Sequence, residues 1–331
     1  MSHLRLTAPG LPDTPPWHLS VDGMSPAGPN LSHWPGNRTP EGWKADLSTE
    51  ICLNFADASE GEQAEFLAGA TAVLNDHYDT DGFLSLLAVL RPDVALPRRD
   101  TLLAAAATGD YQSFQGENGF AIDRIVCNLA APFSPLQAEF EGLPGPAEKD
   151  LARYRWLVDH AEAILDEPRQ FKALFADELA EVQRQLGDDS IRTTLLPDAG
   201  LALIRSVGPV HRTVLNTVAQ RCFRVLHSQA SDAGHRFRFH DRTESWFEVR
   251  TFTPPPRRDL TPVLESLREL EPPHDLTAQW CLDPSDEPVP ELYFGIPSTQ
   301  AYGQLTRRLL PSRIPPADVE ARLVAFFGSN E

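Results

Sequence analysis

Two largely apolar segments, residues 71–75 and 83–90, flank one short acidic stretch, and this arrangement limits the fold more than any other feature of the sequence. The first segment has the length and composition of a buried strand. The second is apolar on nearly every side, as in a helix buried in a core. A buried strand joined to a buried helix by a short turn is typical of an α/β domain with a mainly parallel sheet.

The rest of the chain predicts two domains behind an irregular arm. Residues 1–16 are rich in proline and form the predicted arm, residues 17–190 form the α/β domain with a helical C-terminal part, and residues 191–331 form a smaller α+β domain. In this last part, the predicted element order β-α-β-β-α-β resembles a split βαβ unit.

Several expectations in the two domains are specific enough to be checked. Asp100 is the expected N-cap of a helix that ends at Ala107. An amphipathic helix is expected over residues 211–226, and a hairpin is expected from strands 235–241 and 244–252 around Arg242-Thr243.

The acidic stretch between the two apolar segments has the residue types of a metal site. His77, Asp79 and Asp81 lie at alternate positions, directly after the predicted strand, and Gly82 is expected to allow a sharp turn. Carboxylates in a turn converge on hard cations, and histidine adds a nitrogen ligand suited to Mn²⁺, Fe²⁺ or Zn²⁺. The alternative is a solvated turn in which the carboxylates only cap helices.

This stretch resembles the first motif of the DHH-type phosphoesterase superfamily, His-x-Asp-x-Asp-Gly between a strand and a buried helix. The resemblance implies that His77, Asp79 and Asp81 hold two divalent metals, usually Mn²⁺, with Asp110 as the aspartate of the second motif, and that His77, Asp79 and Asp81 form the catalytic centre. The superfamily's Asp-His-His motif is absent here. The whole chain also looks like an uncharacterised bacterial family that carries this motif and the string His-Trp-Pro-Gly-Asn, which is residues 33–37 in this sequence.

Two further regions have the composition of substrate-binding sites. His33, Asn37 and Arg38 lie on a loop framed by proline and glycine. Arg236 and Arg238 share one face of a predicted strand, in a segment, 205–258, that has ten arginines against four acidic residues. These five residues are the predicted contacts to a small anionic substrate, although a surface role accounts for the same pattern.

Charge and missing motifs exclude other classes of function. The net charge of −18 disfavours nucleic acid as a partner. No apolar run is long enough for a membrane span and no secretory signal is visible, so we expect a cytoplasmic protein, and a homodimer is compatible with the sequence. The sequence contains no GxGxxG, GxxxxGK[ST], GxSxG or HExxH motif.

The combined prediction is a metal-dependent, phosphoesterase-like hydrolase that acts on a small anionic or phosphorylated compound. Two alternatives stay open. One is a non-catalytic ligand-binding or regulatory protein on a DHH-like scaffold. The other is a single-metal enzyme of specialised metabolism, in which His33 joins His77 as a ligand.

Overall fold

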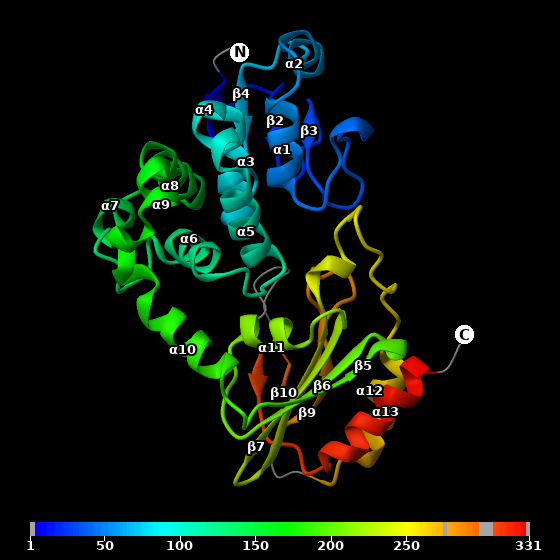
Figure 1. Cartoon of the computed structure of the whole chain (residues 1–331). Helices are drawn as coiled ribbons and strands as arrows, with labels where there is room; N and C mark the ends of the chain where they lie inside the picture. Colours follow the sequence, from blue (N-terminus) through cyan, green and yellow to red (C-terminus); the bar gives the residue numbers. More distant parts are fainter. Residues whose placement is uncertain (1–3, 274–276, 298–306, 329–331) are drawn as a thin grey trace. The chain divides into compact units, whose positions relative to one another are not determined.

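The computed structural model of the chain describes residues 4–273, 277–297 and 307–328 and confirms the α/β class. The chain divides into two compact units (Figure 1). The first unit contains residues 1–181 together with the segment Phe247–Thr253, and the second contains Val182–Trp246 and residues from Pro254 onward. Of the helices in the described part of the chain, none is both long and apolar enough to cross a membrane.

The first unit is built on a small parallel sheet with the strand order β1-β4-β2-β3. Its strands are β1 (Arg5–Leu6), β2 (Leu19–Val21), β3 (Asn30–Leu31) and β4 (Ala72–Leu74). The irregular arm predicted for residues 1–16 is therefore only partly irregular, because Arg5 and Leu6 pair with Ala72 and Val73 of β4. All neighbouring strands run parallel, so their carboxyl ends meet at one edge of the sheet.

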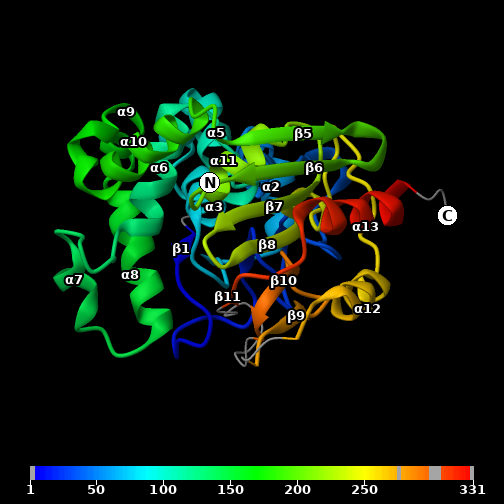
Figure 2. The ribbon, with the colours of Figure 1, turned by 90° about the horizontal axis from the view of Figure 1, so that it is seen from below.

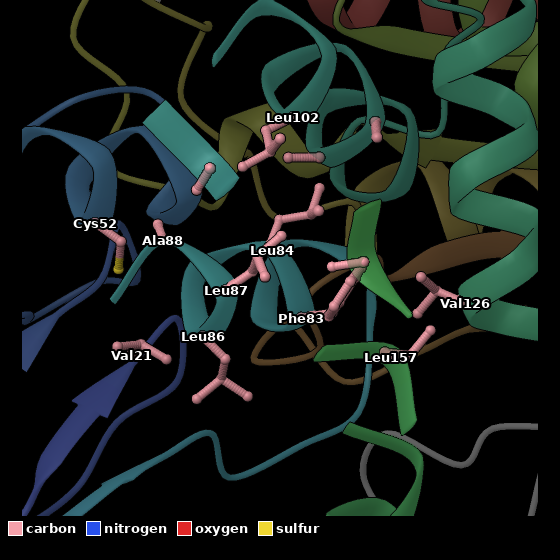
Figure 3. Packing of buried hydrophobic residues seen from close by; sticks show 14 of the residues in the cluster. Val21, Cys52, Phe83, Leu84, Leu86, Leu87, Ala88, Leu102, Val126 and Leu157 are labelled. Atoms are coloured by element: carbon pink, nitrogen blue, oxygen red, sulfur yellow. The ribbon is translucent and has the colours of Figure 1, made fainter. Parts of the chain in front are cut away.

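Helices pack around this sheet and form the larger hydrophobic core. The helices up to the unit boundary are η1 (Glu41–Trp43), α1 (Ser48–Ala56), α2 (Glu60–Leu67), α3 (Thr80–Leu90), α4 (Pro92–Ala95), η2 (Leu96–Arg98), α5 (Arg99–Asp110), α6 (Glu117–Asn128), α7 (Gln137–Glu141), α8 (Pro146–Asp159), α9 (Ala161–Asp166), η3 (Pro168–Leu174) and α10 (Ala176–Leu186). Helix α3 contacts α1 and α5 and is buried along ten of its residues, as its apolar sequence predicted. Figure 3 shows Phe83, Leu84 and Leu87 of this helix among the core side chains.

Two predicted helix starts in the first unit are wrong. Helix α3 begins at Thr80, so Asp81 and Gly82 belong to its first turn instead of the preceding loop. Helix α5 begins at Arg99 with Arg98 as N-cap, so Asp100 lies inside the first turn, where a carboxylate is favoured by the helix dipole.

The second unit is a mixed sheet with helices on its faces. Its elements are β5 (Arg192–Leu196), η4 (Pro197–Ala199), β6 (Leu201–Ser206), α11 (Arg212–Val218), β7 (Arg224–Ser231), β8 (Gly234–Asp241), η5 (Thr243–Ser245), α12 (Thr261–Leu270), β9 (Gln279–Leu282), β10 (Glu291–Ile296), β11 (Arg308–Leu309) and α13 (Pro316–Gly328). The main path of the sheet is β11-β10-β8-β7-β6-β5, and Figure 2 shows β5, β6, β7, β8 and β10 in this order. One face is apolar and packs with residues of α12 and α13.

Three expectations for this unit are corrected. The unit is not a split βαβ fold, because β6 and β7 pair directly in parallel with no strand between them. The helix predicted over residues 211–226 ends at Val218, since residues from Arg224 onward pair in the sheet as β7. The hairpin is formed by β7 and β8, while residues 244–252 form no strand.

Candidate metal centre

Three parallel strands deliver polar side chains to the same edge of the first sheet. Asp22 directly follows β2, His33 lies two residues after β3, and His77 lies three residues after β4. The carboxyl ends of adjacent parallel strands are where open α/β sheets bind ligands. Residues that are 55 positions apart along the chain, Asp22 and His77, thereby come within contact distance, with Nε2 of His77 lying 3.1 Å from Oδ2 of Asp22.

Helix ends bring the carboxylates of Asp79, Asp81 and Asp110 to this edge. Asp79 is the N-cap of α3, since its Oδ1 atom accepts a hydrogen bond from the Gly82 N–H at 2.8 Å. Asp81 accepts hydrogen bonds from the N–H groups of Ser48 at 2.9 Å and Thr49 at 2.8 Å, which are the first residues of α1. Asp110 is the last residue of α5. Asp79 and Asp81 therefore cap helices, and these hydrogen bonds fix the positions of their carboxylates.

The side chains form two groups that share Asp22. The His77 group is Asp22, His77 and Asp79, and the His33 group is Asp22, His33 and Asp81. Within each group the potential ligand atoms all lie within 4.8 Å of one another, which is a spacing that a single metal ion can bridge. Oδ2 of Asp110 lies 3.2 Å from Nε2 of His33 and adds a carboxylate beside the His33 group.

The protonation of His33 is set by its neighbours. Its Nδ1 atom lies 2.7 Å from the carbonyl oxygen of Asp46, so Nδ1 carries the proton and donates. The buried Nε2 atom then presents a lone pair toward oxygen atoms of Asp22 at 3.9 Å, Asp81 at 3.8 Å and Asp110 at 3.2 Å. Nε2 has no hydrogen-bond partner within the described ranges. A lone pair that faces several carboxylates is suited to a bound cation, and a histidine held through its other nitrogen by a carbonyl is the usual form of a metal ligand.

His77 has a similar arrangement. Its Nδ1 atom lies 2.8 Å from Oδ1 of Asp76, and its Nε2 atom lies 3.1 Å from both Asp22 and Asp79. One nitrogen thus has a carboxylate that orients the ring, while the other faces the two carboxylates of its group. The indole of Trp34 lies against the ring of His77, with centroids 4.9 Å apart.

The protein interior makes this crowding of carboxylates costly in the absence of a cation. Burial, together with the nearby carboxylates of Asp79 and Asp81, raises the pKa of Asp22 to about 8. Burial and the charge of Asp81 raise the pKa of Asp110 well above its usual range. Burial opposes the charged form of His77, but Asp79 and Asp22 raise its pKa well above the usual value. The raised pKa values favour protonated Asp22, Asp110 and His77, and these protons offset the negative charge that a bound metal ion could balance instead.

The pKa values of His33 and Asp79 are lowered, in contrast to those of Asp22, Asp110 and His77. Burial lowers the pKa of His33, so its imidazole is kept neutral, which is the form that binds metals. Burial also opposes ionisation of Asp79, but the charge of His77 lowers the pKa of this carboxyl. The centre thus contains groups whose pKa values are pushed apart, as is common at functional sites.

Tight backbone geometry surrounds Asp22, which the two groups share. Asp22 has φ +60°, a left-handed conformation that is uncommon for residues other than glycine and that often marks functional sites. The sequence suggested that Gly82 allows a sharp turn. This is wrong, because Gly82 lies in the first turn of helix α3. A Cβ atom on Gly82 would lie 1.9 Å from the side-chain amide of Asn75, so glycine is required there for close approach.

Asp22 is the residue that the sequence analysis missed. It directly follows β2 and precedes Gly23, and no role was predicted for it from the sequence. The same pattern, a polar residue directly after an apolar strand, had been given weight at His77. Applied to residues 19–21, the same pattern points to Asp22.

The residues predicted to contact substrate have protein partners. His33 belongs to one of the two groups that could hold a metal ion. Asn37 donates from its side-chain amide to the carbonyl of Trp34 and to Glu248, and Arg38 donates to the carbonyls of Ser25 and Gly28. These bonds hold the loop, and a role of Asn37 and Arg38 in substrate binding stays a prediction.

The two arginines of the second unit lie on β8. Arg238 donates through Nε and Nη2 to the buried carboxylate of Glu291, with both distances 2.9 Å. Arg236 lies on the same face of the strand, opposite Gln229 of β7. Binding of a substrate anion by Arg236 and Arg238 stays a prediction.

The fold and the site define an α/β protein whose first unit contains buried His and Asp groups that could bind a metal. The chain belongs to the Family of unknown function (DUF6687), whose family model matches residues 10–331. A comparison with curated proteins finds no match.

Proposed function

We propose that the protein is a metal-dependent hydrolase that cleaves a small anionic ester, most simply a phosphate ester, with two divalent ions in the first unit. The observation that carries the proposal is the environment of His33, whose Nε2 lone pair is buried against carboxylates and has no hydrogen-bond partner among the residues described. A protonated imidazole is disfavoured there by burial, which leaves a metal ion as the suitable cation.

The balance of charge favours two ions over one. Asp22, Asp79, Asp81 and Asp110 contribute four carboxylates when ionised, and His33 and His77 would contribute no charge when they bind metal ions as neutral imidazoles. Two divalent cations balance this charge, whereas one leaves an excess of two negative charges in a largely buried place. In addition, His33 and His77 fall into separate groups of potential ligands that share only Asp22.

Each residue has a distinct role in this proposal. His77 and Asp79 would hold one ion, His33 and Asp81 would hold the other, and Asp22 would contact both. When bound, such ions supply a water with a lowered pKa and neutralise negative charge on the reacting ester. The mixed nitrogen and oxygen ligands suit Mn²⁺, although Fe²⁺ and Zn²⁺ bind similar sets.

The surrounding groups orient the proposed ligands. The Asp46 carbonyl and the Asp76 carboxylate hold the Nδ1 atoms of His33 and His77. The N–H groups at the start of α1 hold Asp81, which keeps its carboxylate directed into the centre. Such outer contacts affect metal affinity by about 10-fold to 100-fold in other metal sites.

A direct test combines metal content with activity. Protein purified without chelator is analysed for metals, titrated with Mn²⁺, and assayed with a panel of phosphate esters, beside the double variant Asp79→Asn/Asp81→Asn and the control Asp100→Asn, which changes an exposed carboxylate. We expect two ions per chain and Mn²⁺-dependent hydrolysis in the wild type and the control, and neither in the double variant. Absence of bound metal in the wild type would refute the proposal.

The stoichiometry also separates the alternatives. One ion per chain would favour a single-metal enzyme in which His33 and His77 act together, and the sharing of Asp22 by both histidines is compatible with it. Two ions without turnover of any ester would favour a ligand-binding or regulatory protein.

A further inference from the structure

A segment from the later part of the sequence lies against His33. The residues Phe247–Thr253, here named the strap, belong to the first unit, although the chain on both sides of them belongs to the second. The strap connects η5 to the proline-rich segment before α12 and forms no helix or strand. Its contacts in the first unit are concentrated around one candidate ligand.

The first contact is with the imidazole ring of His33. The ring of Phe247 stacks on it, with centroids 3.8 Å apart and planes inclined by 19°. The next residue, Glu248, donates from its backbone N–H to the carbonyl oxygen of His33 at 2.8 Å. Phe247 therefore covers one face of the imidazole, and Glu248 fixes the main chain of His33.

The second contact is with the group that sets the tautomer of His33. The carboxylate of Asp46 accepts hydrogen bonds from the backbone N–H groups of Arg250 and Thr251, the latter at 2.9 Å, and from the Thr251 hydroxyl. The carbonyl oxygen of Asp46 accepts from Nδ1 of His33. The strap thus holds both the ring and the residue that orients it.

A third contact fixes the loop that follows His33. The carboxylate of Glu248 accepts from the Gly36 N–H at 3.0 Å and from the Asn37 side chain at 2.8 Å. The strap therefore contacts the ring of His33, the Asp46 residue that fixes its tautomer, and the loop that follows it. These three contacts orient the Nε2 atom of His33.

We propose that the strap positions His33 for metal binding, with Phe247 and the main chain at residues 250–251 as positioning elements. The inference rests on the proposed metal centre and adds that the affinity of the ion bound by the His33 group depends on a segment that supplies no ligand. The ion bound by the His77 group would depend on it much less, since the strap contacts His33, Asp46 and the loop after His33, together with Glu41, Lys44 and Tyr111.

The test is a titration of the full chain with Mn²⁺, which resolves the two affinities, in the wild type, Phe247→Ala and Phe247→Tyr. We expect Phe247→Ala to lower the affinity for one of the two ions by about 10-fold to 100-fold and to change the affinity for the other by no more than about threefold. We expect Phe247→Tyr to keep both affinities close to those of the wild type, because tyrosine keeps a planar ring over the imidazole. Arg250→Ala is the matched control, since it removes the ion pair with Glu41 but keeps the backbone N–H that reaches Asp46.

A second measurement needs no variant. Binding energy is reciprocal, so an ion that depends on the strap must in turn stabilise the strap. We expect Mn²⁺ to slow amide hydrogen exchange of residues 248–251 in the wild type, measured by mass spectrometry of peptides covering the strap.

The outcomes distinguish this inference from the function on which it rests. A wild type that binds no Mn²⁺ overturns the metal centre and the inference together. A wild type that binds two ions, with both affinities unchanged or equally weakened in Phe247→Ala, overturns the strap inference alone. Exchange in the strap that is unaffected by bound Mn²⁺ does the same.

Discussion

The side-chain amide of Asn75 lies 3.3 Å from Oδ2 of Asp22, and it donates to the carboxylate shared by the two candidate ligand groups. The oxygen of the same amide accepts from the backbone N–H of Gly23 at 3.1 Å. Asn75 thus ties the end of β4 to the end of β2. Space for its amide exists only because residue 82 has no side chain.

Replacing Gly82 by alanine should therefore displace Asn75. The added Cβ atom would lie 1.9 Å from the amide nitrogen, so we expect a loss of about 1–3 kcal/mol in the free energy of unfolding, and a weaker Mn²⁺ affinity. The matched control is Gly61→Ala in α2, where nothing lies within 4 Å of the new atom and alanine should stabilise the helix by about 0.5–1 kcal/mol. Chemical denaturation compares the two, and equal effects would contradict this account.

Asp22→Asn should separate stability from metal binding. Without metal, removal of one crowded buried carboxyl should raise the free energy of unfolding by about 2 kcal/mol, and asparagine tolerates the left-handed backbone. With Mn²⁺, the variant should lose the rise in melting temperature that the wild type shows. Thermal melts with and without Mn²⁺ check both effects, and a variant that is still stabilised by Mn²⁺ would exclude Asp22 as a ligand.

His227 should contribute to the pH dependence of the second unit. Burial, with added repulsion from Arg238 and Arg212, lowers the pKa of His227 to about 4. Between pH 6.5 and 4 the unfolded chain takes up a proton that the folded chain does not, so stability falls as the pH falls. The difference corresponds to roughly 3 kcal/mol at pH 4. His227→Asn should make the curve of stability against pH shallower in this window, and parallel curves would count against it.

Glu291 should be a structural residue of the second unit. Its fully buried carboxylate pairs with Arg212 and Arg238 and lies 3.5 Å from Nε of Arg307. Glu291→Gln removes the negative charge from among these guanidinium groups and should destabilise the fold by roughly 3 kcal/mol. Glu265→Gln on the exposed side of α12 is the control, with an expected change within about 0.5 kcal/mol. A variant as stable as the wild type would indicate that these arginines are free to bind another anion.

The sequence predicted the parts of the fold that have a strong local pattern. The strand at residues 72–74 and the buried helix after it were recognised because apolar side chains dominate both. Strands β1 and β3 are two residues long and have no periodicity, so they could not be recognised. Residues 224–226 were assigned to a helix because their pairing partners in β6 and β8 are distant in the sequence.

Local pattern predicted the candidate site only where its residues are neighbours in the sequence, while Asp110 was expected from the family resemblance and His33 as a ligand only in one alternative. His77, Asp79 and Asp81 lie within one short motif, whereas Asp22 and His33 reach them through the pairing of β2 with β3 and β4. His33 was therefore placed on a substrate-binding loop. The contact between His33 and Phe247 joins positions far apart in the chain, and no local pattern indicates it.

The position of the strap in the sequence has a consequence for biosynthesis. All the proposed ligands, from Asp22 to Asp110, are translated well before Phe247. At the usual rates of chain elongation, the ribosome needs roughly 7–27 s to add the residues between Asp110 and the strap. During that interval the nascent chain has every carboxylate and imidazole of the centre but not the aromatic ring that covers His33. On the strap proposal, stable metal loading should accordingly come only after residues 247–253 have been made.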